Sequence, residues 1–117
     1  MVVLYVDSNA AARNARSAAL QQQGWRVYDV ATGTEASTWI SQANSLNILI
    51  TEAIFDANST GFELRDQALK KFPDSTVIFT TRYDLAGFET QVGKTPVIID
   101  KPLSAEELVA KIAAHLK

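Results

Sequence analysis

The sequence predicts an α/β domain in which five parallel strands form one sheet and helices cover both of its faces. Short apolar runs alternate five times with segments rich in helix formers, an alternation typical of strands joined by crossover helices. Three helix-start motifs of one type also fall where three of the helices should begin. The chain has 117 residues, enough for one core and too few for a second domain, so residues 1–117 are assigned to a single domain.

The five apolar runs define the strands. Residues 2–6 are apolar and β-branched, which indicates a strand buried on both faces. Residues 25–30 alternate in part between apolar and polar side chains, which favours a position at the edge of the sheet. The remaining strands are predicted at residues 46–52, 76–81 and 96–100.

Capping motifs mark most of the helices. Residues 10–23 are rich in helix formers, and Gly24 closes them as a C-cap. Capping boxes, in which a hydroxyl and a carboxylate three residues apart bind free backbone donors, begin three further helices. They are Thr32–Glu35, Thr60–Glu63 and Ser104–Glu107. A weaker pattern predicts a short helix over residues 86–92, and residues 53–60 are predicted to be a loop.

Composition excludes several classes of function. The net charge of −2 argues against a nucleic-acid-binding surface. The absence of cysteine excludes disulfides and thiolate chemistry and fits a cytoplasmic protein. The apolar run at residues 1–6 is too short for a signal peptide and lacks the positive charge of one. No apolar stretch approaches the roughly 18 residues of a membrane span. The one histidine, His115, is expected on an exposed helix face.

Polar side chains follow four of the predicted strands. Because the carboxyl ends of parallel strands meet at one edge of the sheet, these side chains are expected to lie close together. They are Asp7, Ser8, Glu52, Thr81, Arg82 and Lys101. Each also has a plainer role open to it: Asp7 or Ser8 as a helix N-cap, Glu52 and Lys101 as a surface ion pair, and Thr81 as a strand end. Buried charges must be paired, so the joint arrangement favours a functional cluster centred on Glu52.

Four segments of the chain together resemble a response-regulator receiver domain over nearly its whole length. They are residues 3–7, residues 24–36, residues 76–81 with their terminal hydroxyls, and residues 100–103 with a Lys-Pro pair. The resemblance implies a flavodoxin-like (βα)5 three-layer sandwich with strand order 2-1-3-4-5. It also implies a non-enzymatic role in two-component signal transduction and phosphorelay.

The departures from the family pattern are informative. The aspartate that accepts the phosphoryl group in the family falls on Glu52, and the second of two adjacent acids after the first strand is Ser8. Ile98 stands at the aromatic switch position, and Arg82 stands where a small residue is usual. The switch hydroxyl and the lysine are retained as Thr81 and Lys101.

These departures weaken phosphoryl chemistry. Phosphoryl transfer needs Mg²⁺, for which Asp7 and Glu52 would be the ligands, and Ser8 removes a negative charge from that site. Glu52 is also longer than aspartate by about 1.5 Å of bond length, and a misplacement of about 1 Å can cost 10²-fold in rate. We therefore expect neither phosphorylation by the normal route nor a resident cofactor. Glu52 is instead expected to hold a locked conformation through contacts with Lys101, Thr81 and Arg82.

Three functions remain open. The first is an atypical receiver that acts through protein–protein interaction, with a histidine kinase or an output domain as partner. Its surface, which could also form a homodimer, would be the fourth helix, fifth strand and fifth helix, since Ile98 cannot couple the site to that face by ring rotation. The second is a receiver that still accepts a phosphoryl group, at Glu52 or Asp56. The third is a flavodoxin-like cofactor binder, disfavoured because residues 7–9 offer a carboxylate where a phosphate would sit.

Overall fold

Five parallel strands form the central sheet of the computed structural model, which describes residues 1–52, 54–56, 59–81, 97–100 and 104–115. The strand order is β2-β1-β3-β6-β7, which confirms the predicted order 2-1-3-4-5. The bounds are β1 Val2–Val6, β2 Arg26–Val30, β3 Ile48–Glu52, β6 Thr76–Thr81 and β7 Val97–Asp100. β1 is buried along nearly its whole length while β2 lies at the edge and is largely exposed, as their different apolar patterns predicted.

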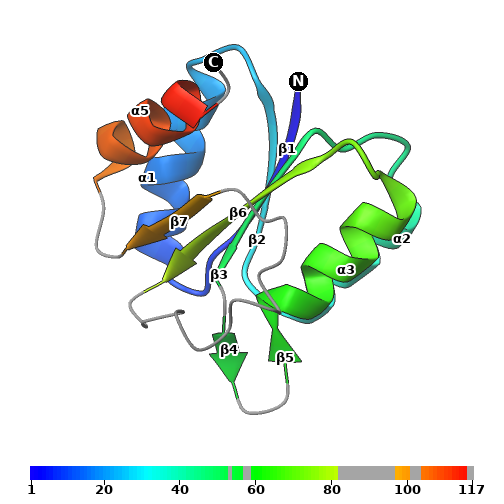
Figure 1. Ribbon diagram of the computed structural model, residues 1–117. Coiled ribbons are helices and arrows are strands. Elements are labelled where there is room, and N and C mark those ends of the chain that lie inside the picture. The colour runs from blue at the N-terminus through cyan, green and yellow to red at the C-terminus, as the bar shows by residue number, and fades with distance from the viewer. Residues whose placement is uncertain (53, 57–58, 82–96, 101–103, 116–117) are drawn as a thin grey trace.

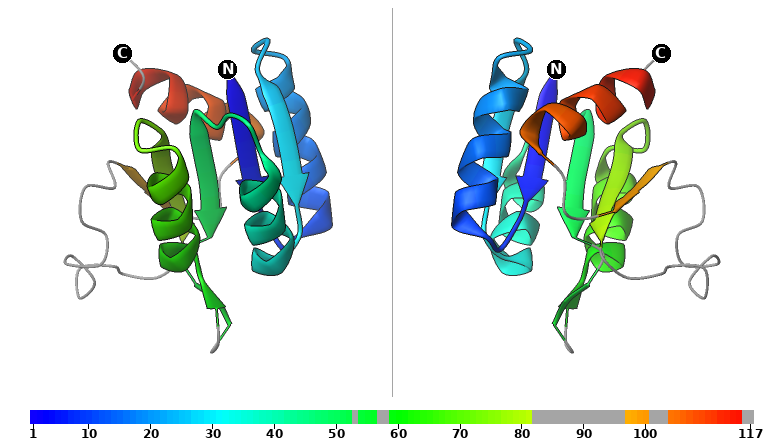
Figure 2. Two further views of the ribbon diagram at one scale, coloured as in Figure 1. Left: turned by 90° about the vertical axis from the view of Figure 1, so that its right-hand side faces the viewer. Right: turned by 90° about the vertical axis from the view of Figure 1, so that its left-hand side faces the viewer.

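Helices cover both faces of the sheet. Figure 1 shows α1 (Ala10–Gln21) and α5 (Ala105–His115) on one face, with α2 (Gly33–Gln42) and α3 (Gly61–Lys71) on the other. The side views in Figure 2 show the resulting three layers. No helix in the described part of the chain is long and apolar enough to cross a membrane.

The alternation of side chains along the strands divides the core into two clusters, one on each face of the sheet. The cluster under α1 and α5 contains Val3, Tyr5, Leu20, Ile48, Ile50, Ile78, Leu108 and Ile112. The cluster under α2 and α3 contains Leu4, Val6, Ala36, Ile40, Leu46, Leu49, Phe62, Leu64, Ala68, Val77 and Phe79. These assignments fix which face the polar residues at the strand ends share.

The helix-start motifs are confirmed where their side chains are described. The Thr32 hydroxyl accepts a hydrogen bond from the backbone N–H of Glu35 at 3.1 Å, and the Ser104 hydroxyl accepts one from the N–H of Glu107 at 3.1 Å. The side chain of Thr60 lies outside what the structure describes. The helix predicted over residues 10–23 ends at Gln21 with Gln22 as its C-cap, so the C-cap role predicted for Gly24 is wrong. Gly24 lies two residues beyond the cap and has φ +85°, a left-handed conformation that favours glycine.

The N-cap of α1 differs from the one considered from the sequence. Asn9 is the N-cap, and its side-chain oxygen accepts a hydrogen bond from the backbone N–H of Ala12 at 3.0 Å. The cap role considered for Asp7 or Ser8 is therefore wrong. Both residues precede the cap, which leaves their side chains available for other contacts.

The segment predicted as a loop after β3 contains a small hairpin, so that prediction is wrong in part. β4 (Ile54–Asp56) pairs antiparallel with β5 (Ser59–Thr60). Only Ala57 and Asn58 separate them in the sequence, a spacing typical of a tight hairpin turn. Figure 2 shows the hairpin projecting beyond the carboxyl end of the sheet. The short helix predicted over residues 86–92 lies outside the described residues.

Candidate functional site

Strand register places three polar residues on one face at the carboxyl end of the sheet. Ile50 pairs with Ile78 and Glu52 pairs with Thr80 in the β3–β6 ladder. Since both isoleucines belong to the core under α1 and α5, Glu52 and Thr80, two residues further along, face the same side. Asp7 follows Tyr5 on β1 by the same step. The site is thus the polar end of the α1/α5 face.

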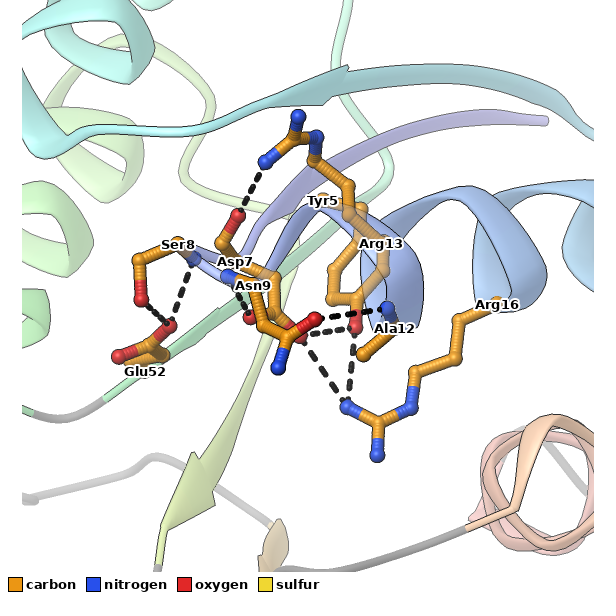
Figure 3. A network of polar contacts seen from close by, with 8 residues as sticks. All are labelled: Tyr5, Asp7, Ser8, Asn9, Ala12, Arg13, Arg16 and Glu52. Carbon is orange, nitrogen blue, oxygen red and sulfur yellow. Dashed lines mark hydrogen bonds and ion pairs between the residues drawn. The ribbon is translucent and has the colours of Figure 1, made fainter.

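Glu52 is held by the turn after β1. Its Oε1 atom accepts a hydrogen bond from the backbone N–H of Ser8 at 2.9 Å and another from the Ser8 hydroxyl at 3.1 Å. Figure 3 shows Ser8 and Glu52 facing each other across this contact. The residue that stands where an acid was expected therefore donates to the neighbouring carboxylate.

Asp7 is engaged by a different set of groups. Its Oδ2 atom accepts a hydrogen bond from the Tyr5 hydroxyl at 2.7 Å and forms an ion pair with Nη1 of Arg16 at 3.1 Å. Its Oδ1 atom accepts the backbone N–H of Asn9 at 2.9 Å. Asp7 is 1% exposed and Arg16 is 7% exposed. A carboxylate buried to this extent requires such a partner.

Tyr5 completes this buried network. Its hydroxyl lies 3.2 Å from Nη1 of Arg16 as well as next to Asp7 (Figure 3). Burial raises the pKa of the Tyr5 phenol well above its ordinary value, the Asp7 carboxylate raises it further, and Arg16 opposes the shift. The phenol therefore keeps its proton, and its O–H donates a hydrogen bond to the Asp7 carboxylate. We call Tyr5, Asp7 and Arg16 the buried triad.

Arg13, one turn before Arg16, contacts the same part of the chain without reaching the Asp7 carboxylate. Its Nη1 donates to the backbone carbonyl of Asp7 at 2.8 Å. Its Nε lies 3.7 Å from the Asp29 carboxylate at the end of β2. Arg13 thereby fixes the path of the turn against β2.

Gly61 allows the start of α3 to approach β3 closely. A Cβ atom at this position would overlap the backbone carbonyl oxygen of Glu52 and lie 3.1 Å from Cγ2 of Thr51. The Thr51 hydroxyl donates to the same carbonyl of Glu52 at 3.0 Å. The backbone under the Glu52 side chain is thus fixed by packing that only glycine permits.

The other predicted site residues are placed only in part. Thr81 ends β6, with Asp100 as its partner in the β6–β7 ladder, and Ile98 pairs with Phe79; only the backbone is described at Thr81 and Ile98. Asp56 ends β4, outside the central sheet. Arg82 and Lys101 lie outside the described residues. The lock between Glu52 and Lys101, Thr81 or Arg82 therefore stays a prediction.

Sequence reasoning missed two residues of the network, Tyr5 and Arg16. Arg16 lies four residues before Leu20, on the one face of α1 that is buried, and a charged residue at such a position signals a buried partner. Tyr5 is the one hydroxyl-bearing residue in an otherwise aliphatic β1, two residues before Asp7. Thr80 belongs to the same row, and its hydroxyl is buried without a hydrogen-bond partner in the described part of the chain.

The described contacts of Asp7 and Glu52 compete with a divalent cation for the same carboxylate oxygens. Mg²⁺ requires several oxygen ligands in near-octahedral geometry. Both oxygens of Asp7 accept hydrogen bonds from protein donors, and Oε1 of Glu52 accepts two from Ser8. No group of three acidic, histidine or cysteine side chains suited to a metal occurs among the described residues.

Comparison with known proteins identifies the fold. No family model matches the chain, and no curated protein matches it in sequence. Solved structures match it over nearly its whole length. A response regulator receiver protein from Sinorhizobium medicae WSM419 is 16% identical with a TM-score of 0.86, and the match covers 99% of this chain and 94% of that one.

Two further structures match similarly. A CheY-like receiver domain protein from Methanospirillum hungatei JF-1 is 24% identical with a TM-score of 0.82 (98% and 92% covered). The response regulator TrrA from Thermotoga maritima, solved in complex with Mg²⁺ and BeF, is 21% identical with a TM-score of 0.79 (97% and 96% covered). At these identities the match establishes the fold and leaves the chemistry to be argued from the site.

Proposed function

Since this chain has the fold of response-regulator receiver domains, we propose that it is an atypical receiver of two-component signal transduction that works without phosphorylation. The observation that carries the proposal is the contact between Ser8 and Glu52. The carboxylate at the acceptor position accepts two hydrogen bonds from the residue that replaces a metal-binding acid. A phosphoryl acceptor must instead present its oxygen in line to the donor, with charge neutralised by Mg²⁺.

The contact also supports a fixed state of the site. Glu52 is one carbon longer than aspartate, and this length carries its carboxylate to the turn after β1. A hydrogen bond to a charged group is stronger than one between neutral groups, so two such bonds favour a single arrangement of the turn and of β3. Lys101, Thr81 and Arg82 are the further partners that we propose for Glu52.

Output would then depend on a surface of fixed shape. We propose that the domain is cytoplasmic and binds a protein, either a histidine kinase or an output domain. The face formed by residues 86–92, β7 and α5 is the proposed docking surface, and a homodimer through this face is a further arrangement of the same kind. Binding of nucleic acid or of a membrane is not part of the proposal, and neither is enzymatic activity or a flavin cofactor.

The second candidate is a receiver that still accepts a phosphoryl group, at Glu52 or at Asp56. It is favoured by the carboxylate of Glu52 at the end of the central strand and by Asp56 in the hairpin beside it. The two candidates differ in one measurable property, which is a covalent phosphoryl group on the protein.

The test is intact-protein mass spectrometry after incubation with acetyl phosphate and Mg²⁺, or with a phosphorylated histidine kinase. The proposal expects no mass gain in the natural chain, and a gain of one phosphoryl group would contradict it. A variant with Ser8→Asp and Glu52→Asp rebuilds the acidic pattern and is expected to gain reactivity. Glu106→Asp, on the exposed side of α5, is the matched control and should stay unmodified. Glu52→Gln and Asp56→Asn would identify the acceptor if the natural chain reacts.

A further inference from the structure

A cavity of about 330 Å³ lies at the amino end of the sheet, between β2 and the end of α2. The residues that line it include Val2, Arg26, Tyr28, Trp39, Gln42 and Asn44. Val2 and Arg26 form the first pair of the β1–β2 ladder, whereas Glu52 ends β3. Figure 2 shows the N-terminus and the hairpin after β3 at opposite ends of the sheet. The cavity is therefore separate from the site around Glu52.

Two aromatic rings form one wall of the cavity. The ring centroids of Tyr28 and Trp39 are 5.2 Å apart, with an angle of 43° between the ring planes. Tyr28 pairs with Leu4 in the β1–β2 ladder, and Leu4 belongs to the core under α2 and α3, so the Tyr28 ring lies on the face that α2 covers. Tyr28 is 40% exposed. An aromatic ring that remains open to water in this way can stack on a planar ring of a ligand.

The polar side chains around the cavity are not engaged by the protein itself. Arg26, Gln42 and Asn44 are exposed. Within the described part of the chain, none of these three side chains forms a hydrogen bond or an ion pair with another residue. A guanidinium presents its donors in a planar fork that matches the two oxygens of a carboxylate. Arg26 is thus a free binding group for a carboxylate, and the two amides can hydrogen-bond to its polar substituents.

The local charge favours an anion although the whole chain carries a net charge of −2. None of the described residues that line the cavity is acidic. The C-terminus of a helix carries a partial negative charge, which would oppose an anion at the end of α2. Lys71 compensates for this charge, because its Nζ atom donates to the carbonyl oxygens of Ile40 and Ser41 at 3.0 Å and 2.9 Å.

We propose that this cavity binds a small aromatic carboxylate, with the ring of the ligand against Tyr28 and Trp39 and its carboxylate on Arg26. Ligand sites in proteins have volumes of about 300–1,000 Å³, so a cavity at the lower end of this range suits a ligand of one or two fused rings. The inference does not rest on the proposed function, because the cavity shares no residue with the site around Glu52. It gives the domain a second binding site, at the other end of the sheet.

The test is a titration of the full chain with naphthoate, which has two fused rings and one carboxylate, followed by ¹H–¹⁵N spectra. The indole N–H resonance of Trp39 should shift saturably, with a Kd of about 1 mM or below. Trp25 is the internal control, because it packs against the core on the other face of the sheet, and its indole resonance should move much less. Naphthamide has nearly the same shape without the charge and should bind at least about tenfold more weakly.

Three variants assign the binding groups. Arg26→Gln should bind naphthoate at least about tenfold more weakly than the natural chain and should leave the binding of naphthamide unchanged. Lys111→Gln, on the exposed side of α5, is the matched control, because it removes the same charge from the other face of the sheet, and it should bind like the natural chain. Tyr28→Leu removes a ring from the aromatic wall and should weaken the binding of both probes by a similar factor.

The absence of a saturable shift at Trp39 would overturn the inference, and so would an equal or larger shift at Trp25. Equal effects of Arg26→Gln and Lys111→Gln on naphthoate binding would also contradict it, because they would show that the carboxylate does not lie on Arg26. A Tyr28→Leu chain that binds both probes as tightly as the natural chain would exclude the aromatic wall. All three substitutions replace exposed side chains, and the amide spectrum of each variant shows that it is folded before the titration.

Discussion

Ser8 donates both its backbone N–H and its hydroxyl to one oxygen of Glu52, at 2.9 Å and 3.1 Å. The contact joins the turn after β1 to the end of β3 across 44 residues of sequence. Ser8 stands where receiver domains usually carry a second acid, and Glu52 stands where they carry the aspartate that accepts the phosphoryl group. The two departures therefore belong to one interaction: Ser8 supplies the donors, and Glu52 supplies the acceptor.

Ser8→Ala should lower the free energy of unfolding by about 0.5–1.5 kcal/mol, because it removes the hydroxyl bond to a charged acceptor and leaves the backbone bond in place. Urea denaturation followed by circular dichroism measures the change. Ser45→Ala, at an exposed serine before β3, is the control and should change stability by less than about 0.5 kcal/mol. Equal effects of the two variants would show that the hydroxyl contact contributes nothing.

Arg16→Met should destabilise the domain by about 3–5 kcal/mol, because it removes one partner of a buried ion pair and leaves the desolvation cost of the Asp7 carboxylate in place. The double variant Asp7→Asn/Arg16→Met should be more stable than Arg16→Met alone, since it no longer buries the negative charge that Arg16 pairs with. Chemical denaturation of both variants provides the comparison. Arg26→Met, at an exposed arginine of β2, is the control for the loss of an arginine side chain. A double variant that is less stable than Arg16→Met would contradict the pairing of Asp7 with Arg16.

The stability of the domain should fall at alkaline pH through Tyr5. Its pKa is raised in the folded state, so its contribution is fully present below the ordinary tyrosine pKa of about 10 and is lost as pH rises above that value. The slope from this one group is at most about 1.4 kcal/mol per pH unit. Denaturation at pH 8, 9, 10 and 11 measures it. Tyr5→Phe should show a shallower loss above pH 10, and an unchanged slope would disprove the assignment.

Gly61→Ala should cost about 1–3 kcal/mol, because its methyl group would overlap the carbonyl oxygen of Glu52 and force β3 and α3 apart. The same displacement should move Glu52 relative to Ser8, which the amide resonance of Ser8 in a ¹H–¹⁵N spectrum would report. Gly24→Ala is also destabilising, through its positive φ, but it should leave the Ser8 resonance unchanged. An unshifted Ser8 resonance in Gly61→Ala would contradict the proposed coupling.

The sequence by itself determined the architecture of this protein. Apolar runs such as residues 2–6 and 76–81 define strands because a strand buried on both faces cannot tolerate polar side chains. The capping hydroxyls of Thr32 and Ser104 define helix starts because free backbone N–H groups need acceptors. Both signals are local, and both hold in the structure.

Only the tertiary structure decided which groups meet. Sequence placed Asp7, Ser8 and Glu52 at strand ends but could not pair them, because pairing depends on the register of β1 against β3 and on the rotation of α1 over the sheet. That rotation brings Arg16 to Asp7, nine residues away, and leaves Ser8 to bind Glu52. Hydrogen bonds and ion pairs form or fail on differences in distance of a few tenths of an ångström, and the periodicity of the sequence does not encode such differences.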